Sequence, residues 1–228
     1  MSYHSLIIMR PGVVRLAAVF ALAVGAACGG NPPPASPGTA GQMSGATPHM
    51  LHAPGIREAF SQADVDFMTG MIPHHAQAVI MGGWAPTHGA RSDVAILCGR
   101  IVVGQTDEIK LMQTWLSDRG QMVPDAKSTR MHMVMNGETH DMLMPGMLTD
   151  EEMAQLDKAR GPEFDRLFLV GMIKHHQGAV DMVDVLFKSW GGAQDTQIYK
   201  FASDVYADQS VEIDRMKQML ASGGEPRS

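Results

Sequence analysis

Two adjacent histidines occur twice in this sequence, and each pair follows a methionine. The segment 70–75 reads Gly-Met-Ile-Pro-His-His, and it returns 101 positions later as Gly-Met-Ile-Lys-His-His over 171–176. Imidazole and thioether groups are both ligands for soft transition metals. A lone histidine on an apolar helix face is usually a hydrogen-bonded core residue, but a duplicated pair flanked by methionine indicates a metal site.

The spacing places sulfur and nitrogen on neighbouring turns of a helix. Met71 precedes His74 by three positions and His75 by four, and the second copy repeats this arrangement. A further methionine follows the first histidine of each pair by seven positions. Imidazole with thioether favours copper, especially Cu(I), while zinc or iron are the alternative ions. The candidate metal ligands are His74, His75, His175, His176, Met71, Met172, Met81 and Met182.

Four carboxylates are candidates to support these histidines. Asp64 and Asp165 each lie ten residues before a histidine pair, and Glu108 and Glu212 lie on the expected partner helices. We expect hydrogen bonds to ligand imidazoles rather than direct coordination. The alternative is N-terminal helix charge for the aspartates and ordinary polar contacts of the bundle for the glutamates.

A long connection over 120–148 carries a second set of soft ligands. Its methionines and histidines lie outside any core periodicity, so they either form a secondary Cu(I) site or belong to a linker without that role. Cys98 is expected to be a small buried residue rather than a ligand. The candidate residues of the secondary site are His132, His140, Met131, Met133, Met135, Met142 and Met144.

The apolar periodicity predicts an all-α domain over 59–222. Long helices are expected over about 61–84, 92–117, 161–190 and 195–220, and a capping box at Thr149 opens a shorter helix. The sequence Gln-x-x-Glu-Ile-x-x-Met occurs at 105–112 and again at 209–216, so repeat one (59–119) and repeat two (149–222) are each a helical hairpin. Two such hairpins bury their apolar faces together as a four-helix bundle.

The N-terminus is typical of an exported lipoprotein. Arg10 and Arg15 precede the apolar run 16–24, which is too short to span a bilayer, and small residues then lead to Cys28. We expect a signal peptide over 1–27, lipidation of Cys28, and a Pro/Gly-rich tether over 28–58. Ordinary signal cleavage is the alternative. The expected location is the bacterial cell envelope, at the outer side of the cytoplasmic membrane or in the periplasm, with the membrane as partner through the lipid on Cys28.

The charge excludes one class of partner. The formal net charge is −6, and removal of residues 1–27 takes away two arginines and no acid, which leaves 16 basic and 24 acidic residues, or −8. No basic cluster is present, so nucleic-acid binding is not expected.

These motifs resemble a bacterial secreted family called domain of unknown function 305. The resemblance rests on Met-Ile-Pro-His-His followed by Ala-Val-x-Met, and on Gln-x-x-Glu-Ile-x-x-Met, over roughly residues 60–222. It implies a ferritin-like bundle of two repeated hairpins, and it implies copper binding and tolerance in the periplasm, which are associated with some members. The paired histidines of the family correspond to His74, His75, His175 and His176. Lys174 departs from the proline at position 73 of the first copy, so the two halves need not bind equally.

Three functions remain open from the sequence. The first is a non-enzymatic copper protein that buffers the ion, confers tolerance or relays it in the envelope. The second is an interaction module whose histidines form a hydrogen-bonded polar core without metal. The third is a di-iron oxidase, which the ferritin-like resemblance suggests, but such bundles require Glu-x-x-His on two helices and this chain contains no such sequence.

Overall fold

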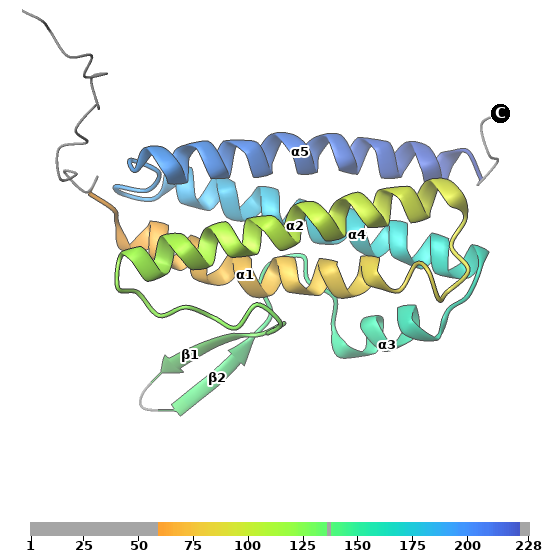
Figure 1. Cartoon of the computed structure of the whole chain (residues 1–228), viewed down its shortest axis with the longest axis horizontal. Helices are drawn as coiled ribbons and strands as arrows, with labels where there is room; N and C mark the ends of the chain where they lie inside the picture. The colour runs from red at the N-terminus through yellow and green to blue at the C-terminus, as the bar shows by residue number, and fades with distance from the viewer. Residues whose placement is uncertain (1–58, 136–137, 224–228) are drawn as a thin grey trace, which may run out of the picture. The chain divides into compact units, whose positions relative to one another are not determined.

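A computed structural model describes residues 59–135 and 138–223. The expected signal peptide, the lipidation site and the whole of the tether lie outside the described residues. The described chain is an all-α bundle with one small hairpin of strands (Figure 1). Its helices are α1 (Gln62–Gly83), α2 (Ser92–Asp118), α3 (Asp150–Lys158), α4 (Pro162–Lys188) and α5 (Thr196–Ala221).

Side-chain caps fix where several helices begin. At α1, Ser61 accepts a hydrogen bond from the backbone of Asp64, whose carboxylate accepts one from the Ser61 backbone in return. Thr149 and Glu152 form the same reciprocal pair at α3. Gly161, with φ of 56°, leads into Pro162 at the first turn of α4, where proline lacks only an N–H that the helix does not need.

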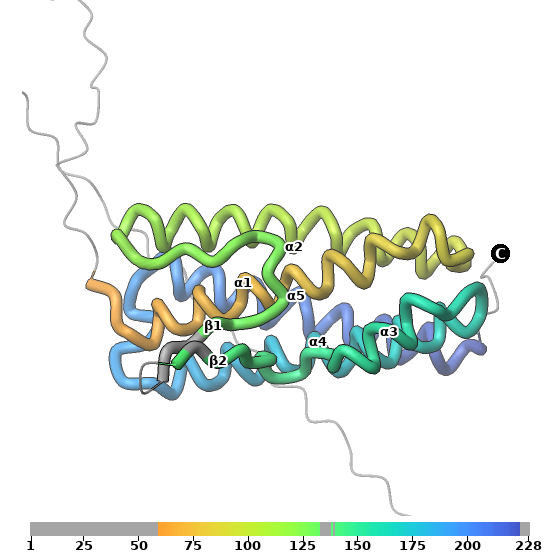
Figure 2. The backbone as a smooth tube through the Cα atoms, turned by 90° about the horizontal axis from the view of Figure 1, so that it is seen from below, coloured from red at the N-terminus to blue at the C-terminus, as the bar shows by residue number. Residues whose placement is uncertain are grey.

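The four long helices pack as two hairpins. α1 lies along α2, and α4 lies along α5, while α1 also packs against α4 across the molecule. Figures 1 and 2 show the connection from α2 to α4, with its strands and α3, on the side of α1 and α4 that faces away from α5. The two sequence repeats therefore form the two halves of one bundle.

The connection over 120–148 is more ordered than the sequence led us to expect. β1 (Met131–Met135) pairs antiparallel with β2 (Glu138–Met142), and Met131 stands opposite Met142. The sequence between the strands is Asn-Gly, which is the strongest short-range indicator of a β-hairpin. Reading this segment only for metal ligands missed that signal.

The buried core consists of two apolar clusters separated by a polar layer. One cluster joins the N-terminal half of α1 and the C-terminal half of α4, with Met68 and Met112 among its members. The other joins the opposite halves of the same helices, with Phe164 and Met216 among its members. α1 and α4 are therefore antiparallel, and the histidine pairs lie at the level where the clusters meet.

None of the described helices has both the length and the apolar character of a membrane-spanning segment.

Candidate metal centre

All four paired histidines are fully buried, each with 0% of its surface exposed. The antiparallel packing of α1 and α4 brings the two pairs to the same level of the bundle. The ring centroids of His74 and His175 are 3.8 Å apart. Within each pair the two centroids are 6.2 Å apart, because successive helical residues point about 100° away from each other.

The second histidine of each pair is held by a glutamate of the neighbouring helix. His75 Nε2 donates to Glu108 Oε2 at 2.7 Å, and His176 Nε2 donates to Glu212 Oε2 at 2.7 Å. Both glutamate side chains are 26% exposed. The carboxylate acceptors place a proton on Nε2, so in the neutral tautomer of each ring the lone pair lies on Nδ1.

The first histidines differ between the two halves. His74 Nε2 donates to the carbonyl oxygen of Pro145 at 3.1 Å, while neither ring nitrogen of His175 has a partner. The Nδ1 atoms of His74, His75 and His176 are also buried without a partner, so five of the eight ring nitrogens make no hydrogen bond. Such atoms are rare in protein interiors, because each unsatisfied polar atom costs about 1–3 kcal/mol.

Burial keeps two of these rings neutral. Loss of solvent lowers the pKa of His74 and of His175 well below the usual value of 6.5. The neighbouring imidazoles lower both pKa values further. A neutral imidazole is the form that binds a metal, so these two rings can coordinate without first losing a proton.

The candidate thioethers lie on both sides of the histidine layer. Met71 and Met172 are fully buried and belong to different apolar clusters, since each precedes its histidines by one turn on antiparallel helices. Met81 and Met182 are about 10 Å from the first histidine of their own helix, measured along the axis. The methyl end of Met182 lies against Gly70, and that of Met81 lies against Gly171.

The nitrogen and oxygen donors alone do not make a metal site. Among residues 59–135 and 138–223, no three His, Cys, Asp or Glu side chains are grouped so that they could hold one ion. Zinc is usually bound by four ligands of these types, so a zinc site of that kind is not preformed here.

Two of the four candidate carboxylates, Asp64 and Asp165, make hydrogen bonds at the ends of helices, in agreement with the alternative role considered for them. Asp64 caps α1 and accepts a hydrogen bond from the Ala193 backbone at 2.7 Å. Asp165 accepts one from the Arg91 backbone at 3.2 Å. Both carboxylates stand more than two helical turns before their histidines, so they hold loops at the ends of the bundle instead.

A short strap, which we define as residues 144–148, covers the histidine layer and was not found from the sequence. Gln77 bonds the Leu148 backbone in both directions, at 3.0 and 2.7 Å. Gly178 occupies the equivalent position in repeat two, and its missing side chain leaves room for Pro145 and Gly146. The sequence does contain a signal for the strap, because the two repeats differ at this position, with Gln77 in the first and Gly178 in the second.

The remaining candidates lie in the connection or in the core. His132 Nδ1 pairs with Asp141 on the surface of the hairpin, and His140 and Met142 are exposed. Met133 and Met135 are residues of β1. Met144 belongs to the strap, and its side chain lies against Gly70 of α1.

Cys98 is buried in an apolar cluster. Burial, followed by the negative charge of Asp165, raises its pKa from 9.0 to about 12. A thiol held in this protonated form is a poor metal ligand.

The model of a known sequence family, domain of unknown function DUF305, matches residues 64–220. This stretch contains both histidine pairs and the two glutamates that hold them. The chain belongs to the DUF305 family. The crystal structure of a DUF305 protein from Streptomyces coelicolor is 28% identical and has a TM-score of 0.58, covering 73% of this chain and 96% of that one. A DUF305 fragment from Deinococcus radiodurans is 24% identical, with a TM-score of 0.58 and coverage of 72% and 98%, and shows the same fold.

Another similar structure contains copper. CopM in its Cu(I)-bound form is 28% identical to this DUF305 chain, with a TM-score of 0.53 and coverage of 70% and 96%. CopM has also been crystallised in a Cu(II)-bound form, which is 29% identical, with a TM-score of 0.53 and the same coverage. No curated protein sequence matches this chain.

Proposed function

We propose that this protein binds copper in the bacterial cell envelope and buffers or relays the ion without catalysing a reaction. The paired histidines of the two repeats supply the nitrogen ligands. The observation that carries the proposal is the set of five buried ring nitrogens without a hydrogen-bond partner.

A purely structural role for the histidines does not explain these atoms. A hydrogen-bonded polar core is stable when its members satisfy one another, because a partly satisfied network is worse than an apolar core. Here both nitrogens of His175 are unsatisfied at the centre of the bundle. Coordination of a metal would use these lone pairs and remove the penalty.

The surroundings of the layer favour copper over zinc. Met71 and Met172 supply buried thioethers one turn from the histidines, and thioether is a soft ligand that suits Cu(I). Because no three nitrogen, thiolate or carboxylate groups are assembled in the described part of the chain, sulfur is needed to complete a site. Similarity to a protein crystallised with Cu(I) and Cu(II) supports the same ion.

The protein's own groups prepare the histidines for an ion. Glu108 and Glu212 hold the proton on Nε2 of His75 and His176 and leave Nδ1 as the donor. Burial keeps His74 and His175 neutral. The strap and the two apolar clusters exclude water from the layer.

We assign a weaker capture role to the hairpin. Met131 stands opposite Met142 in the register, and His140 lies two residues before Met142 on the same strand, so the three side chains share one face. Export and attachment through lipidated Cys28 would place both sites outside the cytoplasm, where the protein would encounter the copper of the cell envelope.

A competition titration with Cu(I) tests the assignment. The full chain carrying Cys28→Ser, to prevent lipidation, is compared with the same chain carrying His175→Gln, and His132→Gln serves as the control because His132 is an exposed histidine of the hairpin. We expect His175→Gln to weaken the tightest Cu(I) binding at least about tenfold, which corresponds to about 1.4 kcal/mol. Equal affinity in all three chains would remove the buried histidines from the function.

Thermal unfolding with and without Cu(I) separates loss of binding from loss of folding. A ligand that binds only the folded state must raise its stability. We expect Cu(I) to raise the Tm of the parent chain and of His132→Gln. If the Tm is unchanged by copper, the interaction-module function is correct instead.

A further inference from the structure

A cavity lies between α1 and α4 on the side of the strap. It has a volume of about 290 Å³ and is open to solvent. Pro145 lines it, and the carbonyl oxygen of Pro145 accepts the hydrogen bond from His74, so the strap lies between the cavity and the histidine layer. The residues that line the cavity also include Ala63 and Asp66 of α1, Met144 of the strap, and Asp181 and Met182 of α4.

Two of these side chains, Met144 and Met182, meet over Gly70. A Cβ atom at Gly70 would lie 2.7 Å from the methyl carbon of Met144, 3.4 Å from its sulfur and 3.5 Å from the methyl carbon of Met182. Gly70 precedes His74 by about one turn of α1. The cavity therefore carries two thioethers close to each other and one turn from an imidazole of the layer.

The equivalent glycine of repeat two, Gly171, has different neighbours. Because α1 and α4 are antiparallel, it lies on the opposite side of the layer, and we call the two sides the Gly70 side and the Gly171 side. A Cβ atom at Gly171 would lie 3.1 and 3.5 Å from the methyl carbons of Leu148 and 3.4 Å from that of Met81. Leu148 is 4% exposed, and Gln77 fixes its backbone by two hydrogen bonds. The Gly171 side thus has one thioether and a fixed leucine in place of the second.

The Gly171 side is also filled where the Gly70 side is open. Phe164 occupies the position that corresponds to Ala63, and it is fully buried. α3 lies along this part of the bundle, as Figure 1 shows, and its Leu156 is 1% exposed in the same apolar cluster as Phe164. A large buried ring therefore takes the space that the small alanine leaves to the cavity.

The charge around the cavity favours the Gly70 side for a cation. Asp66 and Asp181 line the cavity and are exposed. The corresponding residues on the Gly171 side are Leu167 and Ile80, which carry no charge. Carboxylates around an opening raise the local concentration of cations there.

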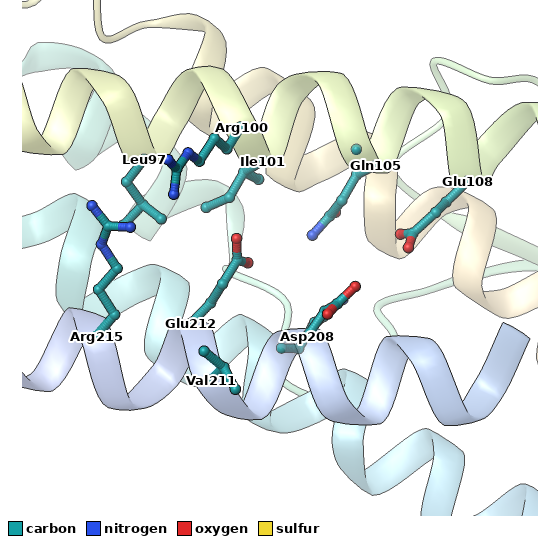
Figure 3. A pocket seen from close by; sticks show the side chains of 11 residues that line it. Leu97, Arg100, Ile101, Gln105, Glu108, Asp208, Val211, Glu212 and Arg215 are labelled. Carbon is teal, nitrogen blue, oxygen red and sulfur yellow. The ribbon is translucent and has the colours of Figure 1, made fainter.

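A groove of about 370 Å³ between α2 and α5 is the alternative route to the layer. Figure 3 shows Glu108 and Glu212 extending into the space between these helices, with Arg100 and Arg215 at one end. The described residues that line the groove offer carboxylate, amide and guanidinium groups, but no sulfur or imidazole. Oxygen ligands suit hard cations, so a soft ion such as Cu(I) would find no matching ligand on this route.

We infer that Cu(I) enters and leaves the histidine layer from the Gly70 side, and that the thioethers of Met144 and Met182 bind the ion in transit. Thioether is a soft ligand for Cu(I), and a flexible methionine side chain can follow the ion as it exchanges sulfur for nitrogen. Copper stays Cu(I) throughout, and the bonds that change are those to the metal. This inference rests on the proposed function, because it concerns the route to the same histidines.

The rate of Cu(I) exchange tests the route. In the full chain carrying Cys28→Ser, Cu(I) is supplied as its bicinchoninate complex for uptake and is removed by excess bicinchoninate for release, and stopped-flow absorbance follows both. Met144→Leu removes one thioether but keeps a side chain of similar volume, so folding is expected to be retained. Met122→Leu is the matched control, because Met122 is 69% exposed and does not line the cavity.

We expect Met144→Leu to slow uptake and release by about tenfold each, because a ligand used only in transit lowers the barrier in both directions. The equilibrium affinity for Cu(I) should stay the same, and Met122→Leu should exchange at the parent rate. Equal rates for the two variants, or a loss of affinity in Met144→Leu, would overturn the inference. The affinity of His175→Gln is measured separately, so failure of the proposed function and failure of this route are distinguishable.

A second variant blocks the cavity without removing sulfur. Ala63→Phe introduces the residue that repeat two has at the equivalent position, and the cavity provides room for the ring. Exchange should slow by about tenfold while the Tm does not fall. Exchange at the parent rate in Ala63→Phe would show that the ion does not use the cavity.

Discussion

The imidazole of His74 lies against the imidazole of His175, with 3.8 Å between the ring centroids. One ring belongs to each repeat, so the contact exists only when both halves of the bundle are folded together. The two rings share a dry environment, which lowers the pKa of both and leaves nitrogen lone pairs without partners. The same pair of rings therefore bears on the stability of the fold, on its sensitivity to acid and on the proposed binding of copper.

As the pH falls, the metal-free protein should begin to lose stability near pH 6.5. This is a higher pH than the one at which protonation of carboxylates alone would destabilise it. Below pH 6.5 the unfolded chain binds protons at His74 and His175, whereas the folded chain does not, because the folded pKa of each is lowered. The free energy of unfolding therefore falls as the pH falls from 6.5, by about 1.4 kcal/mol per pH unit for each group, until the folded pKa is reached. Urea denaturation at pH 7.5, 6.5 and 5.5 measures this slope.

The surface histidine gives the control for that slope. His132→Gln is the comparison variant, because the His132 side chain lies on the surface of the hairpin and is 59% exposed. His175→Gln should reduce the slope. Equal slopes for the parent chain and for His175→Gln would mean that the buried ring does not control the acid response.

Removal of Glu108 should destabilise the bundle more than removal of its neighbour. Glu108→Ala leaves the buried Nε2 of His75 without an acceptor, and this loss is expected to cost about 1–3 kcal/mol. Asp107→Ala, one residue away, removes only an exposed pair with Lys110 and should change the free energy of unfolding by less than about 0.5 kcal/mol. Chemical denaturation of the two variants makes the comparison, and similar losses would contradict a structural role for the hydrogen bond.

Gly178 should tolerate no side chain. A Cβ atom there would lie 1.9 Å from the Pro145 carbonyl oxygen, which is the acceptor for His74. Gly178→Ala should displace the strap and lower the free energy of unfolding by about 3 kcal/mol or more. Gly99→Ala is the control, because nothing lies within 4 Å of a Cβ at that helical position, and it should gain about 0.5–1 kcal/mol. The expected opposite signs can be read from the two denaturation midpoints.

Cys98 should resist alkylation in the folded chain. Its pKa of about 12, against an ordinary 9.0, reduces the thiolate fraction at pH 8 on the order of a thousandfold. In the chain with Cys28→Ser it is the only thiol, so mass spectrometry after iodoacetamide treatment reports on it alone. The folded protein should remain unmodified under conditions that alkylate it fully in urea; rapid labelling without urea would show that the thiol is accessible.

Much of the fold could be predicted from the sequence because the signals are local. The 3.6-residue periodicity, the capping boxes at Ser61 and Thr149 and the Gly161-Pro162 boundary act within a few residues of one another. The duplication indicated two hairpins, and a hairpin that cannot bury its apolar face alone requires the other. These features determined the all-α bundle and placed both histidine pairs on buried faces.

Only the tertiary structure decided how the polar groups meet. The sequence places Glu108 and Glu212 on the partner helices, but only packing brings their carboxylates to His75 and His176. The strap over the layer and the groove between α2 and α5 depend on contacts between residues tens of positions apart. Such contacts arise from the relative placement of whole helices, which a one-dimensional pattern does not encode. The sequence alone thus determined which residue types face inward, and the packed bundle determined which of them can share a ligand.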